Sequence, residues 1–161
     1  MNYTLSELPP LLKKLCLMIL FILSVGVGLG IYYISISVGT SPQQIDKHYN
    51  GSKDLSDEEF QISYQKNVKE ITLTVHNHVL SFALIFSLLS IIFYGVQSIS
   101  PKLKEFLLIE PFISILTTFG SMYLIRFVHE SFVYLMILSS TVLYGSFFLM
   151  VYFSVRELRK K

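Results

Sequence analysis

The residues of this sequence best suited to chemistry are its four histidines, His48, His76, His78 and His129. Imidazole nitrogens bind haem iron and transition metals, and they titrate close to neutral pH. His76 and His78 are two residues apart, so on a helix with about 3.6 residues per turn they point about 200° away from each other. Unless that helix is distorted, the two cannot chelate one metal, and each needs a partner from elsewhere in the chain.

A second candidate for chemistry is Glu110, the one charged residue in the apolar run Phe106 to Ile125. An ionisable side chain within a membrane span is costly and is a functional candidate for that reason. Glu110 precedes Pro111, whose ring frees a backbone carbonyl. Two interpretations stay open: a proton or cation site with Tyr94 as hydrogen bond partner, or an interfacial glutamate that stabilises a kinked helix.

The elements that must position these residues are membrane-spanning helices. The composition is 52% hydrophobic and 15% charged, which is too apolar for a soluble domain of 161 residues. Apolar runs of the length needed to cross a bilayer predict spans at about 15–38, 74–98, 103–127 and 131–155. We therefore predict an all-α fold: a single membrane domain, 1–161, forming a four-helix bundle.

The distribution of charge predicts how this bundle is oriented. Eight of the 13 basic residues flank the same side of the predicted spans, from Lys13 to Lys161, so both termini should be cytoplasmic. The net charge of +2 gives no reason to expect a nucleic-acid partner. The outer loop, 39–70, should carry a short amphipathic helix that begins at a capping box of Ser56 and Glu59.

Small and weakly polar residues recur on one face of each predicted span, and we expect these faces to turn inward. In the second span this places His76 toward the bundle and His78 away from it. Folding the chain about Lys102 puts His76 beside His129, and Tyr94 level with Glu110. The stripes in the first three spans are Gly26, Gly30, Tyr33 and Ser37; Ala83, Ser87, Ser90 and Tyr94; and Glu110, Ser114, Thr117 and Ser121.

These placements predict a cofactor site at the outer mouth of the bundle. His76 and His129 are the preferred ligands of haem b or a transition metal, and Arg126 would pair with a haem propionate. His78 and His48 are reserve metal ligands, and Tyr49 lies nearby in the loop. The alternative is that these side chains form hydrogen bonds to lipid headgroups and loop carbonyls at the interface.

Several short motifs resemble an uncharacterised family of small four-span bacterial membrane proteins. They are Gly39-Thr40, then His48-Tyr49-Asn50-Gly51-Ser52, His76-Asn77-His78, and Glu110-Pro111-Phe112. The resemblance implies a bacterial inner-membrane location and draws attention to His48, Tyr49, Gly51, His76 and His78. It implies no reaction.

The first function that we predict is a multi-pass membrane protein that binds haem or a metal for electron transfer or sensing. The alternatives are a structural or assembly subunit of a larger membrane complex, and a small proton-coupled transporter that uses Glu110. A homo-oligomer is also possible. An enzyme is not favoured, because the sequence contains no nucleophile with a base, no paired carboxylates in a span and no phosphate-binding glycine loop.

Overall fold

The computed structural model describes residues 4–52 and 64–160, and within these residues the chain is helical. Helices α1, α3, α4 and α5 are each long and apolar enough to cross a membrane. The predicted four-helix membrane fold is therefore confirmed. The elements are a 3-10 turn at Leu5–Glu7, α1 (Pro10–Ser37), α2 (Pro42–Asn50), α3 (Val68–Tyr94), α4 (Pro101–Phe127) and α5 (Phe132–Leu158).

Helix starts follow local capping chemistry. Asn67 and Glu70 form a capping box, so α3 begins at Val68, earlier than the predicted boundary near residue 74. Ser41 and Gln44 form a second capping box at the start of α2, a helix that we did not predict. The amphipathic helix predicted from Ser56 begins outside the described residues.

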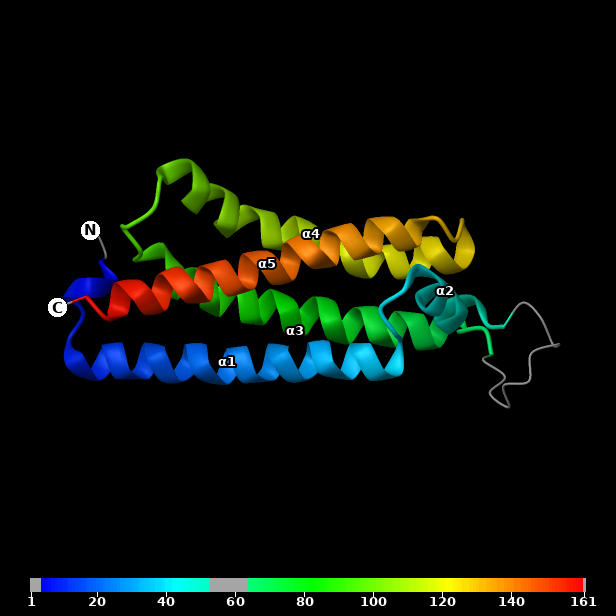
Figure 1. Cartoon of the computed structure of the whole chain (residues 1–161), viewed down its shortest axis with the longest axis horizontal. Helices are drawn as coiled ribbons and strands as arrows, with labels where there is room; N and C mark the ends of the chain where they lie inside the picture. The colour runs from blue at the N-terminus through cyan, green and yellow to red at the C-terminus, as the bar shows by residue number, and fades with distance from the viewer. Residues whose placement is uncertain (1–3, 53–63, 161) are drawn as a thin grey trace.

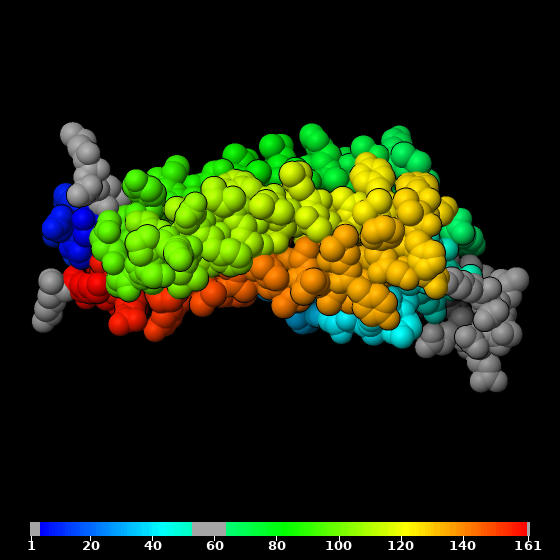
Figure 2. Space-filling model, turned by 90° about the horizontal axis from the view of Figure 1, so that it is seen from above, coloured from blue at the N-terminus to red at the C-terminus, as the bar shows by residue number. Residues whose placement is uncertain are grey.

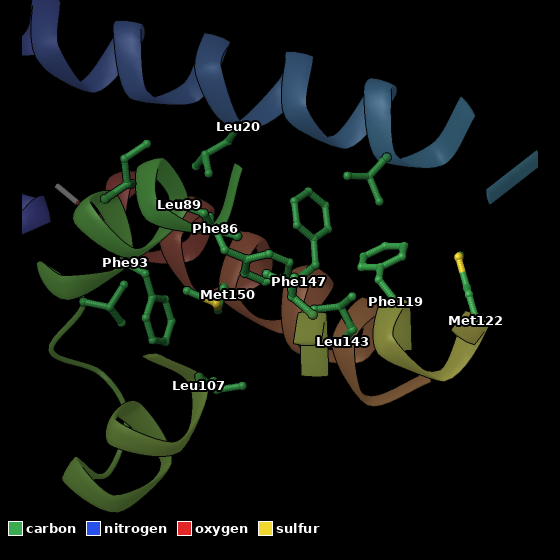
Figure 3. Packing of buried hydrophobic residues seen from close by; sticks show 14 of the residues in the cluster. Leu20, Phe86, Leu89, Phe93, Leu107, Phe119, Met122, Leu143, Phe147 and Met150 are labelled. Atoms are coloured by element: carbon green, nitrogen blue, oxygen red, sulfur yellow. The ribbon is translucent and has the colours of Figure 1, made fainter. Parts of the chain in front are cut away.

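The bundle is elongated, and both ends of the chain lie at the end opposite α2 (Figure 1). We call these the terminal end and the α2 end. Helices α4 and α5 pack against each other most extensively, and they lie side by side in the view of Figure 2. Large apolar side chains fill the core, among them Phe86 and Phe93 of α3 and Phe147 of α5 (Figure 3).

Helix α1 lies along the outside of the other three and contributes little to the core. Leu20 and Val27 are its buried residues, and Leu20 points toward Phe86 and Leu89 in Figure 3. The prediction that the face of this span with Gly26 and Gly30 turns inward is wrong. Both are exposed, and a Cβ added at either would have no atom within 4 Å.

The inward face predicted for the second span is also wrong. His76, Ser87 and Tyr94 are exposed, whereas the opposite face of α3, with Leu89 and Ile92, is buried. One physical reason is that a hydroxyl of α3 can bond to its own helix, as Thr72 does by donating to the Val68 carbonyl at 2.7 Å. A hydroxyl that is satisfied in this way can face lipid, so it no longer marks the interior.

A cavity at the α2 end and an intramembrane carboxylate

A cavity of about 470 Å³ that could hold a small molecule lies at the α2 end of the bundle. It lies within the size range of small-molecule sites, and its walls are mainly apolar. The walls come from the end of α1 and its connection to α2 (Tyr33, Ile34, Ser37, Val38, Gly39, Thr40), α2 (Ile45, His48, Tyr49), Lys66, α3 (Glu70, Ile71, Thr74, His78), α4 (Thr118, Phe119, Met122) and α5 (Met136, Ile137, Ser140, Tyr144).

Helix α2 closes one wall of this cavity. Gly39, with φ +86°, lets the chain turn sharply between α1 and α2, and Ile45 and Tyr49 are buried against the bundle. Asn50 fixes the far end of α2 through its amide Nδ2, which donates to the Ile125 carbonyl of α4 at 3.2 Å. The ring centroid of Tyr49 lies 5.1 Å from that of its neighbour His48.

Burial changes the titration of both side chains on α2. The pKa of His48 is lowered, mainly by burial and also by the nearby positive charge of Lys66. Burial raises the pKa of Tyr49 to about 12. At neutral pH this wall of the cavity therefore presents a neutral imidazole and a neutral phenol, both compatible with an apolar ligand.

His78 brings a histidine to the cavity from within a membrane-spanning helix. Its Nδ1 lies 2.8 Å from the carbonyl oxygen of Thr74, and its ring centroid lies 5.1 Å from the ring centroid of Phe119. A carbonyl only accepts, so Nδ1 donates in this hydrogen bond, and Nε2 of the neutral ring keeps a lone pair. The side of α3 that we assigned to lipid therefore supplies a histidine to the cavity.

The two preferred ligands from the sequence do not line this cavity. His76 is exposed, and His129 is exposed in the turn between α4 and α5, where its Nδ1 accepts a hydrogen bond from the Ser131 amide at 3.1 Å. Arg126 lines a separate polar hollow of about 550 Å³ together with His129. Its guanidinium donates to the Lys66 carbonyl at 3.0 Å and to Gln65 Oε1 at 2.9 Å, so it holds the chain just before α3.

Glu110 lies in a second polar cluster within the membrane. Ser114, one turn further along α4, donates to Oε1, and the buried Ser146 of α5 donates to Oε2 at 2.7 Å. Among the described residues Tyr94 is not a partner of this carboxylate; it is exposed, with Lys104 Nζ 4.9 Å from its ring centroid. The predicted Tyr94–Glu110 pairing is therefore wrong, and Glu110 instead connects α4 to α5.

The predicted metal site has no ready cluster of ligands. Over residues 4–52 and 64–160, no group of three or more His, Cys, Asp or Glu side chains is placed to hold an ion. The cavity offers His48, His78 and two thioethers, Met122 and Met136, from different elements. The sequence analysis did not single out these methionines. For His78 a signal was present: Thr74 lies four residues earlier, the spacing at which a side chain can bond back to a carbonyl of its own helix.

Four apolar helices long enough to cross a bilayer define a multi-pass helical membrane protein. A family model described as a transmembrane helical domain matches residues 39–161, which covers most of the chain, and the protein belongs to this family. The match begins after α1, the helix that lies outside the core. None of the curated proteins and none of the solved structures matches the chain.

Proposed function

We propose that this protein binds a small, mainly apolar molecule from the membrane in the cavity at the α2 end, for sensing or electron transfer. The observation that supports this most is that five helices wall one apolar cavity of about 470 Å³ and bring two histidines, His48 and His78, to it. We further propose a bacterial inner membrane as its location, with the terminal end in the cytoplasm, because basic residues gather at that end.

The test compares what wild-type protein and two variants retain through purification in mild detergent. Ser140→Phe puts a ring into the cavity, whereas Leu138→Phe adds the same ring on a side chain that is 65% exposed. Mass spectrometry of organic extracts should find one apolar species, about one per protein, with wild type and Leu138→Phe. The species should be depleted from Ser140→Phe. Identical extracts from all three proteins would contradict the proposal.

A haem b is the second candidate for the bound molecule, as the sequence predicted, with the reserve histidines His78 and His48 in place of His76 and His129. The hydrogen bond from His78 Nδ1 to the Thr74 carbonyl favours it, because metal-binding histidines commonly donate their other nitrogen in this way. His78, together with His48 or a methionine of the walls, would hold the iron. Lys66, which also lines the cavity, would take the place proposed for Arg126 beside a propionate.

The haem proposal predicts a Soret band after expression in a haem-replete host. His78→Ala should remove this absorbance, and His76→Ala, which alters an exposed residue two positions away on α3, should leave it unchanged. Colourless protein that carries no apolar ligand and co-purifies with a larger membrane complex would favour the assembly-subunit hypothesis instead.

A further inference from the structure

Several polar groups on the walls of the cavity can only accept a hydrogen bond from a ligand. Three hydroxyls on its membrane-embedded walls donate their protons to other groups of the protein: Thr74 to the Glu70 carbonyl at 3.0 Å, Ser140 to the Ile137 carbonyl at 3.0 Å, and Thr118 to Ser139 Oγ at 2.8 Å. A hydroxyl has one proton and two lone pairs, so each of these keeps acceptor capacity but has no proton left to donate.

His78 adds an acceptor of the same kind at the side of the cavity. Its Nδ1 proton is bound by the Thr74 carbonyl, which leaves the lone pair of Nε2 in the neutral ring. Within the described part of the chain, His78 makes no other hydrogen bond. The tyrosine hydroxyls of Tyr49 and Tyr144 can donate or accept, so they fit ligands of either kind.

We propose that the ligand of this cavity is a lipophilic phenol or alcohol whose hydroxyl donates a hydrogen bond to His78 Nε2. The inference rests on the proposed function, and it names the class of the bound molecule. An apolar body of this class suits the walls formed by Phe119, Met122 and Met136, and methionine side chains adapt to irregular shapes. A ligand that carries only acceptors could form no hydrogen bond with His78 Nε2 and would depend on other donors of the walls, such as the tyrosine hydroxyls.

The experiment uses two probes, 4-octylphenol and its methyl ether 4-octylanisole, in which a methyl group replaces the donated proton. Each is dialysed to equilibrium between empty lipid nanodiscs and nanodiscs that hold the full-length protein, so that partition into lipid is subtracted. We expect the phenol to bind in excess, at about one per protein, and the ether to bind about three- to tenfold more weakly, the effect of one hydrogen bond.

Variants assign this preference to His78. His78→Phe keeps a ring but removes the acceptor, so the phenol should lose its advantage, and His76→Phe on the exposed face of α3 should preserve it. His78→Gln offers both a donor and an acceptor, and it should bring the two affinities within about twofold. Circular dichroism identifies the variants that are folded and can be compared.

The outcomes separate the inference from the proposed function. Equal excess binding of both probes overturns the inference and leaves the cavity function standing. No excess binding of either probe counts against both. A stoichiometric Soret band that requires His78 also overturns the inference, since haem iron would occupy the same lone pair.

Discussion

The contact between Glu110 and Ser146 gives a quantitative test of how α4 and α5 are held together. Ser146 is buried and donates to Glu110 Oε2 at 2.7 Å, so Glu110→Leu removes its acceptor at nearly constant side-chain size. A single variant mixes this loss with the altered cost of placing a charge in the membrane. A double-mutant cycle of Glu110→Leu with Ser146→Ala isolates the interaction.

The size of the coupling follows from the environment. Hydrogen bonds between membrane helices contribute about 0.6 kcal/mol on average and up to about 1.7 kcal/mol. The freed hydroxyl can instead turn to a carbonyl of its own helix, as Thr141 does with Ile137 at 2.7 Å, which reduces the loss. We therefore expect a coupling of about 0.5–1.5 kcal/mol.

The assay is unfolding by sodium dodecyl sulfate in mixed micelles, followed by circular dichroism. A matched control cycle combines Glu110→Leu with Thr141→Ala, which removes an exposed hydroxyl of α5 that bonds to its own helix. That cycle should be additive to within about 0.3 kcal/mol. The same additivity between Glu110 and Ser146 would refute the assigned contact.

Three further predictions concern stability in the same micelles. Gly39→Ala should lower the free energy of unfolding by about 1–2 kcal/mol, because φ is +86° and the new Cβ would lie 2.5 Å from Gln44 Oε1. Adding Gln44→Ala should remove the part of this loss that comes from the clash and leave the part that comes from the backbone conformation. Since the pKa of His48 is lowered in the folded state, the unfolded chain takes up the proton first, so the thermal midpoint should fall as pH drops below about 6.5. His48→Gln should flatten that slope, and an unchanged slope would contradict the assigned burial. Thr118→Val removes the hydrogen bond to Ser139 and should cost about 0.5–1 kcal/mol in denaturant titration, whereas a neutral effect would argue against this contact.

The membrane-spanning elements could be predicted because hydropathy and capping act locally. Apolar runs located the four long helices, and α4 begins within two residues of the predicted boundary, at Pro101, where Ser100 caps the Leu103 amide. The boundary of α3 shifted because Asn67 and Glu70 form a capping box that we overlooked. Helix α2 was missed because its nine residues have no long hydrophobic pattern and depend on Ile45 and Tyr49 packing against the bundle.

The faces of the helices were harder to predict. The inward stripe was correct in α4, where Ser114 and Ser121 are buried, because Glu110 and Ser146 form hydrogen bonds between helices. It failed in α3, where large apolar side chains such as Phe86 and Leu89 form the buried face. As a result, His78 lines the cavity and His76 is exposed, which is the reverse of the prediction. Which of these two histidines faces the cavity therefore could not be assigned from the spacing of small residues alone.

One wall of the cavity belongs to α2, a nine-residue helix that is not one of the long apolar helices. The membrane-embedded walls are held in place by whole helices, but α2 is joined to α4 by the contact of Asn50 with Ile125. Any soluble molecule that shifted α2 would change how well the cavity holds its occupant. Thermodynamic linkage requires the reverse as well: the occupant would alter the affinity for that soluble molecule by the same factor.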